Sequence, residues 1–356
     1  MSPKALVLAA GEGSRLRPFT YSRPKHLIPL LGKPMIQYPI EDLLSSGVKD
    51  IGIVVGYFGD LIKEHFGDGS RFNARFNYIF QEKRLGIAHA IYKAIESGFL
   101  DREFIVYLGD NIIGESSRSF LDSFHMNGSD VHILLTRVRD PSQFGVAVLD
   151  GSKVKKLVEK PKEPISNLAV TGFYAFRDPD LVAKAFRDLK PSWRGEYEVT
   201  ELIQWFIDRN YKVTYSEIST WWKDVGTYEG LLDAIYLLLD KEREKIEGDA
   251  KGELRGRVIV ERGAVVEGKV YGPAFIGSGS YIEKSATVEP YTSIESRVRF
   301  SSGVVTRSLI MDGGEISLSR ARLVESVIGA NSKVRCSREL HGDMRLIISD
   351  NSYLEI

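Results

Sequence analysis

Short apolar runs alternate with amphipathic stretches through the first half of the chain. Runs of this kind predict buried strands over residues 5–10, 50–56, 76–81, 103–111 and 130–138. Apolar residues at helical spacing predict helices over 35–47 and 87–98, each of which ends at a glycine. The alternation predicts an α/β fold with a Rossmann-like, mostly parallel sheet that helices cover on both faces.

Polar or glycine-rich residues follow three of these predicted strands. They occupy positions 11–17, 81–86 and 110–111. In open α/β sheets, ligands bind outside the carboxyl ends of the strands. We therefore expect these three segments to meet at one binding crevice.

The pattern changes in the last third of the chain, where an apolar residue recurs at every sixth position. Small residues follow several members of this series four positions later, and residues 328–333 resume the series in a shifted phase. A hexapeptide period is typical of a parallel β-helix, which we predict to be left-handed. The series is Val258, Ala264, Val270, Ile276, Ile282, Val288 and Ile294, and the small residues are Ala274, Ser280, Ala286 and Thr292.

A helix predicted over 231–247 becomes highly charged toward its end and separates the two patterns. We expect a first domain over 1–236, a linker helix over 237–250 and a β-helix over 251–356. The length of 356 residues is sufficient for two domains with separate cores.

Composition narrows the possible functions. The chain has 48 basic and 48 acidic side chains, which argues against a general nucleic-acid or membrane-surface binder. The single cysteine, Cys336, excludes an intrachain disulfide and a metal site built from cysteines. No apolar stretch is long enough to span a membrane, and we expect a cytoplasmic protein.

The segment "GEGSRLRPFTYSRPK" (11–25) combines glycines with positive charge. Gly11 and Gly13 let backbone N–H groups approach phosphate oxygens, and Arg15 and Lys25 add charge. The segment lacks the Gly-Lys-Ser/Thr of a Walker A loop and the third glycine of a dinucleotide fingerprint. A solvated basic turn is the alternative, but it does not explain why this charge follows the first strand.

The stretch "LAAGEGSRLRPFTYSRPKHLIPLLGKPMI" closely resembles the signature of the sugar-phosphate nucleotidylyltransferases, most of all the long glucose-1-phosphate thymidylyltransferases with a β-helical tail. The resemblance continues in order at "FQEKRLGIAHA", "YLGDN", "FGVAVLD", "VEKPKEP", "NLAVTGFYAF", "RGEYEVTELI" and "WWKDVGT". One departure is Ala10, where many relatives have glycine.

The resemblance implies a nucleotide site. The glycines and Arg15 would hold the triphosphate, Lys25 would neutralise phosphate charge in the transition state, and the amide of Gln81 would read a pyrimidine through its O4 and N3–H. Without the resemblance, Gln81 would be an ordinary residue at the end of a strand. The implied nucleotide-binding residues are Leu8, Gly11, Gly13, Arg15, Lys25, Gln81, Gly86 and Asp110.

The resemblance also implies a sugar 1-phosphate site. Glutamates would accept hydrogen bonds from sugar hydroxyls, a lysine would contact the sugar phosphate, and aromatic residues would form walls. The implied residues are Gly145, Glu159, Lys160, Val170, Gly172, Tyr174, Arg194, Glu196 and Trp222.

Asp110 and Asp224 match the family's metal pair. Taken singly, each is more often a turn residue or a helix cap. Mg²⁺ suits such a pair, because it commonly uses one or two carboxylates together with substrate phosphates. Arg15, Lys25, Asp110 and Asp224 would then be the catalytic residues.

The implied reaction transfers a nucleotidyl group from dTTP to α-D-glucose 1-phosphate and releases pyrophosphate. The partners are a nucleoside triphosphate and a sugar 1-phosphate, in a homo-oligomer. The alternatives are UTP, and galactose or N-acetylglucosamine 1-phosphate, because thymine and uracil differ by one methyl group. An inactive nucleotide-sugar sensor is disfavoured by the presence of both carboxylates.

Two readings of the tail remain open. An acetyl transferase would need a histidine base, and the region offers only His341, beyond the clear repeats. An assembly and regulatory module is preferred, and deleting it should change oligomer size while leaving some activity.

Overall fold

The computed structural model describes residues 2–163, 165–336 and 341–356, which form two compact units. The sheet unit contains the chain up to Gly11 together with Ile36–Asp224. The β-helix unit contains Glu12–Met35 together with Val225–Ile356. The domain limits at 236 and 250 stay a prediction.

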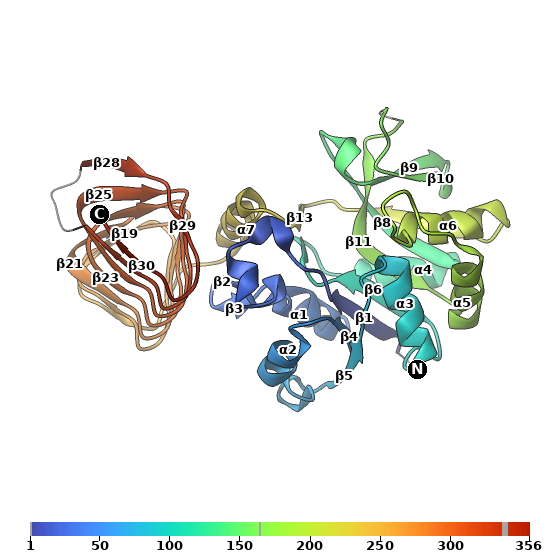
Figure 1. Cartoon of the computed structure of the whole chain (residues 1–356), viewed down its shortest axis with the longest axis horizontal. Coiled ribbons are helices and arrows are strands. Elements are labelled where there is room, and N and C mark those ends of the chain that lie inside the picture. Colours follow the sequence, from blue (N-terminus) through green and yellow to red (C-terminus); the bar gives the residue numbers. More distant parts are fainter. Residues whose placement is uncertain (1, 164, 337–340) are drawn as a thin grey trace. The chain divides into compact units, whose positions relative to one another are not determined.

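A nine-stranded sheet forms the centre of the sheet unit (Figure 1). Strands β5, β4, β1 and β6 run parallel, which confirms the predicted parallel sheet for this half. In the other half β11 runs antiparallel to both of its neighbours, and the hydrophobic pattern did not predict this. The order is β5 (Arg75–Phe80), β4 (Asp50–Val55), β1 (Lys4–Ala9), β6 (Phe104–Leu108), β11 (Leu168–Phe176), β8 (Val131–Arg137), β12 (Val213–Glu217), β10 (Lys153–Glu159) and β9 (Gly145–Asp150).

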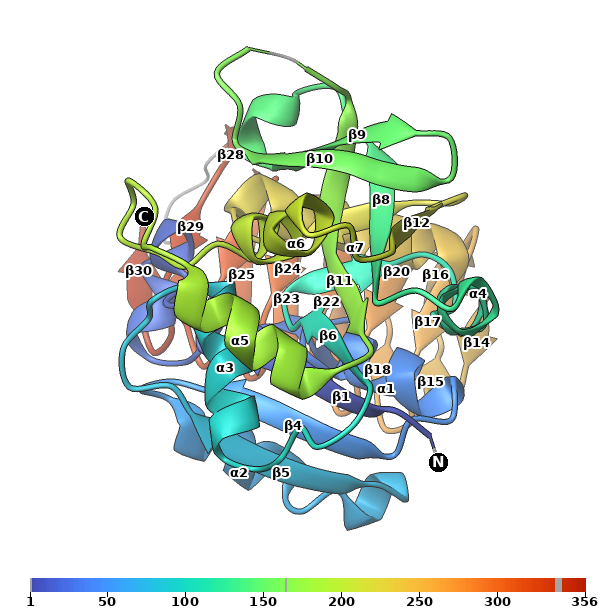
Figure 2. The same cartoon turned by 90° about the vertical axis from the view of Figure 1, so that its right-hand side faces the viewer.

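Helices cover both faces of this sheet. Figure 2 shows α3, α5 and α6 over one face, where they pack against one another. Helix α4 packs on the other face, because Phe120 meets His132 while Ile133, the next residue of β8, belongs to the core beneath α3 and α6. The helices are α1 (Gln37–Ser45), α2 (Gly59–Phe66), α3 (Ile87–Glu96), α4 (Arg118–Asn127), α5 (Pro179–Asp188) and α6 (Val199–Asp208).

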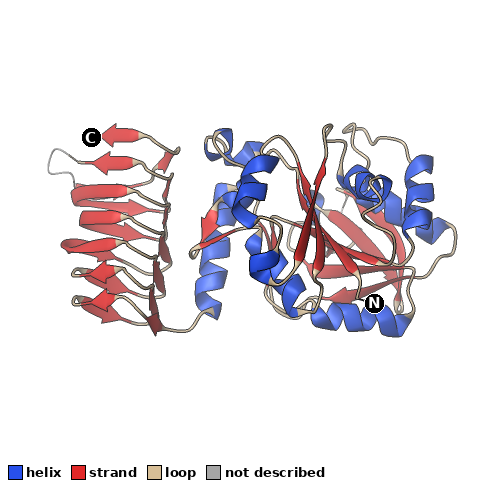
Figure 3. Cartoon of the chain, turned by 90° about the horizontal axis from the view of Figure 1, so that it is seen from below, coloured by secondary structure: helices blue, strands red, loops and turns tan. Residues whose placement is uncertain are grey.

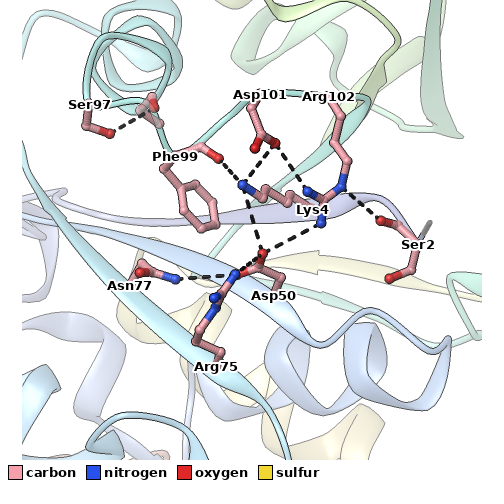
Figure 4. Close-up of polar contacts among 10 residues, drawn as sticks. Ser2, Lys4, Asp50, Arg75, Asn77, Ser97, Phe99, Asp101 and Arg102 are labelled. Carbon is pink, nitrogen blue, oxygen red and sulfur yellow. Dashed lines mark hydrogen bonds and ion pairs between the residues drawn. The ribbon is translucent and has the colours of Figure 1, made fainter.

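The amino ends of the central strands are joined by a cluster of ion pairs (Figure 4). The ammonium group of Lys4, whose side chain is 8% exposed, lies 2.9 Å from Asp101 and donates a 2.6 Å hydrogen bond to the carbonyl oxygen of Phe99. Asp50 lies among Lys4, Arg75 and Arg102. A buried charge needs such partners, so the cluster fixes this edge of the sheet and lies at the ends opposite to the predicted crevice.

The second unit is built from stacked coils of short parallel strands, as Figure 3 shows. All seven members of the predicted six-residue series are fully buried, as are the four small residues that follow them. One sheet contains β14 (Lys245–Ile246), β17 (Val258–Val260), β20 (Ala274–Ile276), β22 (Thr292–Ile294), β24 (Leu309–Ile310), β26 (Val327–Ile328) and β29 (Ile347–Ile348). The other contains β15 (Asp249–Ala250), β16 (Glu253–Arg255), β18 (Val265–Val266), β19 (Lys269–Tyr271), β21 (Tyr281–Val288), β23 (Arg299–Thr306), β25 (Glu315–Val324), β27 (Lys333–Arg335), β28 (His341–Met344) and β30 (Tyr353–Glu355).

Strand register explains why the period loses its phase after Ile294. Ile276 pairs with Ile294, 18 residues later, which is three units of six. Ile294 pairs with Ile310, only 16 residues later, and Ile310 then pairs with Ile328 after 18. One coil is therefore two residues short, and this shortening produces the shifted phase.

The β-helix unit also contains a segment from near the N-terminus. Residues 12–35 form three short 3₁₀ helices (Ser14–Leu16, Phe19–Tyr21 and Lys25–Leu27) and a hairpin of β2 (Pro29–Leu30) and β3 (Lys33–Pro34). Helix α7 (Tyr228–Lys241) belongs to the same unit. The helix predicted over 231–247 was therefore too long, because β14 already begins at Lys245.

No helix within residues 2–163, 165–336 and 341–356 has both the length and the apolar character needed to cross a bilayer.

Candidate active site

Three predicted site segments follow parallel strands of the sheet unit. Gly11 follows β1, Gln81 follows β5 and Asp110 follows β6. Since these strands run parallel in one sheet, their carboxyl ends lie along one edge. Leu8 lies within β1, paired with Val54 and Leu108.

A short ribbon brings the two predicted metal carboxylates to neighbouring positions. Strand β7 (Asn111–Ile113) pairs antiparallel with β13 (Trp222–Asp224), and Asp224 lies opposite Asn111. Asp110 directly precedes Asn111, so residues 114 positions apart in the sequence converge here.

Asn111 connects this ribbon to the sheet. Its amide nitrogen donates a 2.8 Å hydrogen bond to the carboxylate of Asp110. Its amide oxygen accepts hydrogen bonds from the indole of Trp222 at 2.7 Å and from the backbone of Gly172 at 3.3 Å. Because Asn111 is only 2% exposed, its amide is held in one orientation.

Asp110 and Asp224 suit a hard cation such as Mg²⁺. No group of three or more His, Cys, Asp or Glu side chains in the described part of the chain could enclose a metal. Two adjacent carboxylates leave coordination positions for water and substrate phosphates, as Mg²⁺ prefers. The donor set therefore fits a cation that is shared with a phosphorylated substrate.

Gln81 lies 5% exposed just beyond β5, where its amide nitrogen has two acceptors. These are the carbonyl oxygen of Gly86 at 3.3 Å and Nδ1 of His89 at 2.9 Å. Burial lowers the pKa of His89, so the ring is neutral near pH 7 and Nδ1 can accept the hydrogen bond. The amide oxygen of Gln81 can then accept a hydrogen bond from a ligand.

Gly86 has a backbone that only glycine fits. Its φ is +98°, and a Cβ here would lie 2.5 Å from the carbonyl oxygen of Tyr197. Tyr197 pairs with both flanks of this glycine, since its N–H donates to Leu85 and its carbonyl accepts from Ala88. The loop that holds Gln81 is thereby fixed to the start of α3.

A carboxylate cluster lies where β9 and β10 meet α6. Glu159 pairs with Gly145 across the two strands, and its side chain accepts a 3.1 Å hydrogen bond from Thr200. Burial, and next the charge of Glu198, raises the pKa of Glu159. Arg194 compensates for this negative charge.

Arg194 contacts three glutamates, at 3.1 Å from Glu196, 3.4 Å from Glu198 and 3.7 Å from Glu159. The predicted residues Glu159, Arg194 and Glu196 are therefore brought together. Arg194 is engaged by these carboxylates, so its first role here is to hold the glutamates in place.

Strand β11 supplies three further predicted residues. Its register with β8 shifts between Val170 and Tyr174, and Gly172 lies in this irregular stretch. A Cβ on Gly172 would lie 2.5 Å from Leu108, so the close approach of β11 and β6 requires glycine. Burial raises the pKa of Tyr174, and the charges of Glu159 and Asp110 raise it further, which places this phenol between the two carboxylates.

The remaining residues of the sheet unit flank this cluster. Lys160 is exposed, has φ of +41°, and donates its backbone N–H to Phe144. Trp222 packs edge-to-face on Phe144 with ring centres 5.3 Å apart.

Gly13, Arg15 and Lys25 belong to the β-helix unit and are described within it. Gly13 has φ of +65°, and a Cβ on it would lie 2.9 Å from Thr20 and 3.1 Å from Lys25. Lys25 is 9% exposed, whereas Arg15 is exposed. A Cβ on Gly226 would lie 2.8 Å from the guanidinium of Arg15, so this second glycine leaves room for the arginine.

Sequence reasoning missed Asn111, His89 and Thr200 as supporting residues. Asn111 lies within the quoted "YLGDN" motif, and its place directly after the carboxylate was an available signal. The contacts of His89 and Thr200 with Gln81 and Glu159 depend on tertiary packing, and no local signal marks them.

A doubly wound sheet with polar strand ends and a pair of carboxylates defines a nucleotide-binding α/β enzyme. A family model described as Nucleotidyl transferase matches residues 4–241. The chain belongs to this nucleotidyltransferase family.

Individual relatives agree with the family. The chain is 39% identical to a glucose-1-phosphate thymidylyltransferase of Streptomyces griseus over 99% of both chains. It is 32% identical to a UTP–glucose-1-phosphate uridylyltransferase of Haloferax volcanii, over 68% of this chain and all of that one. A crystal structure of a Bacillus anthracis chain assigned as a glucose-1-phosphate thymidylyltransferase, in complex with a sucrose, aligns with a TM-score of 0.63 at 37% identity, covering 68% of this chain and 98% of the other.

Proposed function

We propose that this chain is a glucose-1-phosphate thymidylyltransferase, which converts dTTP and α-D-glucose 1-phosphate into dTDP-glucose and pyrophosphate. The observation that carries the proposal is the 39% identity to an enzyme of that name over 99% of both chains. The convergence of Asp110 and Asp224 supports it, because the reaction needs a site for a polyphosphate and a cation.

The chemistry requires no covalent enzyme intermediate. An anionic phosphate oxygen of the sugar phosphate forms a new bond to the α-phosphorus of the triphosphate. The bond between that phosphorus and the bridging oxygen breaks, and its electron pair leaves with pyrophosphate. Catalysis is then a matter of positioning and of neutralising charge.

Each predicted residue has a role in this proposal. Arg15 and Lys25 bind phosphate oxygens, aided by backbone N–H groups around Gly11 and Gly13. Glu159 and Glu196 accept hydrogen bonds from the hexose, and Lys160 contacts its phosphate. Arg194 holds the glutamates and lies near that phosphate, while Gly145, Val170, Gly172, Tyr174 and Trp222 shape the sugar pocket.

Asp110 and Asp224 would hold Mg²⁺, which when bound would supply positive charge against the triphosphate. Asn111 keeps the carboxylate of Asp110 oriented through its 2.8 Å hydrogen bond.

The base preference follows from the amide of Gln81. Both hydrogens of its nitrogen are used by Gly86 and His89, so its oxygen serves as the acceptor for N3–H of thymine or uracil. Cytosine has no hydrogen at N3 and would present acceptor to acceptor. We therefore expect CTP to be a poor substrate.

The test is a steady-state comparison of dTTP, UTP, CTP and ATP against glucose, galactose and N-acetylglucosamine 1-phosphates, with pyrophosphate release as the readout. The expected result is the highest kcat/KM for dTTP with glucose 1-phosphate. Absence of pyrophosphate release with every pair would refute the proposed function.

UTP-dependent transfer is the second candidate, favoured by the identity to the Haloferax enzyme. One methyl group distinguishes the bases and contributes about 1–3 kcal/mol in an apolar pocket. A kcat/KM for UTP above that for dTTP in the same assay would select this candidate.

We also propose a cytoplasmic homo-oligomer, supported by a single cysteine in 356 residues and by the extended side strands of the β-helix. Light scattering of the purified chain would measure the oligomer size.

A further inference from the structure

The segment that carries Lys25 is held by the β-helix. Residues 12–35 form one compact unit with Val225–Ile356, although more than 300 positions separate the contacting residues in some cases. Two buried carboxylates of the β-helix make the polar contacts with residues 18–33, which we call the Lys25 segment.

Asp350 makes the first contact, close to the end of the chain. One oxygen of its carboxylate accepts hydrogen bonds from Arg23 at 2.9 Å and from Ser22 at 2.5 Å. Its other oxygen accepts from the backbone N–H of Ala330 at 2.8 Å. The Asp350 side chain is only 3% exposed, so solvent screens the ion pair with Arg23 weakly.

Glu295 makes the second contact, from strand-end residues of another coil. Its side chain is fully buried, and one carboxylate oxygen accepts a 2.8 Å hydrogen bond from the backbone N–H of Gly32. The other oxygen accepts a 2.6 Å hydrogen bond from Ser293. Gly32 fits closely, since a Cβ there would lie 3.0 Å from Phe275 and 3.4 Å from Glu261.

A short path connects these contacts to the lysine. Arg23 is followed by Pro24, whose fixed φ limits the freedom of the backbone, and then by Lys25. The stem of Lys25 lies against Gly13, and Thr20 donates a 2.9 Å hydrogen bond to the carbonyl oxygen of Gly13. Phe19 is fully buried and packs edge-to-face on Tyr228 with ring centres 5.9 Å apart.

We infer that the β-helix positions the Lys25 segment for catalysis, with Asp350 and Glu295 as the positioning residues. The tail is then part of the reaction machinery, in addition to any role in assembly. Neither carboxylate is a catalytic residue, because each acts through the segment. This inference rests on the proposed function for its kinetic consequence, but its structural consequence can be measured separately.

Asp350→Asn tests the first contact with little disturbance of the β-helix. The remaining amide oxygen can still accept from Ala330, while the new NH₂ group faces two donors, Arg23 and Ser22. We expect kcat to fall about 10- to 100-fold, since small displacements of a catalytic group have effects of this size. We also expect faster hydrogen–deuterium exchange in peptides covering residues 18–33.

Asp343→Asn is the matched control. Asp343 lies in the same unit and contacts Arg322 at 3.4 Å, but it is 60% exposed and does not touch the segment. Asp350→Asn would overturn the inference if its kcat and its exchange rates matched those of Asp343→Asn.

A double variant separates positioning from general damage. If Arg23 and Asp350 act through one contact, Arg23→Ala combined with Asp350→Asn should lower kcat no further than the more severe single change. Multiplicative losses would contradict a shared contact.

Glu295 offers a conservative pair of variants. Glu295→Gln keeps an acceptor for Gly32, whereas Glu295→Met has similar volume and leaves that N–H buried without a partner. We expect Gln to retain near wild-type kcat and Met to lose about tenfold or more. Equal kcat for the two variants would remove Glu295 from the proposal.

Failure of the proposed function and failure of this inference give different results. A wild-type chain that releases no pyrophosphate refutes the function, while exchange in residues 18–33 still reports whether Asp350 and Glu295 hold the segment. An active enzyme with unchanged exchange and kcat in Asp350→Asn and Glu295→Met refutes only the inference.

Discussion

Lys25 combines near-complete burial with a positive charge. It is 9% exposed and its stem lies against Gly13. In the proposed reaction its ammonium group faces phosphate oxygens on which negative charge increases in the transition state. Preorganised charge of this kind is worth far more in a buried site than in water.

Lys25→Ala should therefore lower kcat about 10²- to 10³-fold, by analogy with other preorganised donors. The measurement is pyrophosphate release at saturating substrates. Lys63→Ala, an exposed lysine on α2, is the control and should leave kcat unchanged. A Lys25→Ala enzyme within about threefold of wild type would contradict the role.

Asp110→Asn tests the proposed cation site. The substitution keeps the size of the side chain but removes one negative charge beside Asn111 and Asp224. Activity should be nearly absent at every Mg²⁺ concentration, measured by titrating Mg²⁺ in the same assay. Full recovery at high Mg²⁺ would limit Asp110 to affinity for the ion.

At this scale the sequence predicted side chains better than their supports. Asp110 and Gln81 follow recognisable strands, so their shared edge could be inferred from the apolar runs alone. The meeting of Asp224 with Asn111 could not, because it depends on β7 and β13 pairing across 111 residues.

Among the elements, the start of α3 depends on one glycine. Gly86 has φ of +98°, and a Cβ on it would lie 2.5 Å from a backbone oxygen of Tyr197. The same loop positions the amide of Gln81. Any side chain here would strain the backbone and also displace the loop.

Gly86→Ala should destabilise the protein by about 1–3 kcal/mol and raise the KM for the triphosphate. Thermal melting and steady-state kinetics would measure the two effects. Gly98→Ala is the matched control, because Gly98 has φ of +74° but no atom within 4 Å of the added Cβ. Equal melting temperatures and KM values for the two variants would show that the contact with Tyr197 has no effect.

The elements that the sequence predicted share one property, a pattern visible within a short window. Strands β1, β4, β5, β6 and β8 and the repeats from Val258 to Ile294 all have it. The antiparallel direction of β11 and the hairpin of β2 and β3 were not predicted, because they depend on partners distant in sequence.

For the molecule as a whole, Glu295 links stability to pH. Burial raises the pKa of this carboxyl to about 7, and the charge of Asp312 on a neighbouring coil acts in the same direction, while Ser293 and Gly32 oppose it by donating hydrogen bonds. Glu261, close to Gly32, is a further carboxylate beside the same hairpin.

The sign follows from the raised pKa. The folded state keeps a proton that the unfolded state releases above its ordinary pKa of 4.5, so the related stability is fully present below that pH and is lost as pH rises to about 7. Glu295→Gln should remove this dependence, which amounts to about 3 kcal/mol. Melting temperatures from pH 4 to 8 would test it, with exposed Glu315→Gln as the control, and parallel curves for wild type and Glu295→Gln would contradict it.

The pairing of Arg23 with Asp350 across 327 positions has a consequence for synthesis. On the ribosome, residues 12–35 emerge among the first, while the residues that receive them emerge last. The strands of the sheet can begin to associate as they leave the exit tunnel, but the lysine-bearing stretch must wait for nearly the final codon. Nascent chains of this protein should therefore remain inactive and sensitive to protease near residue 20 until translation ends.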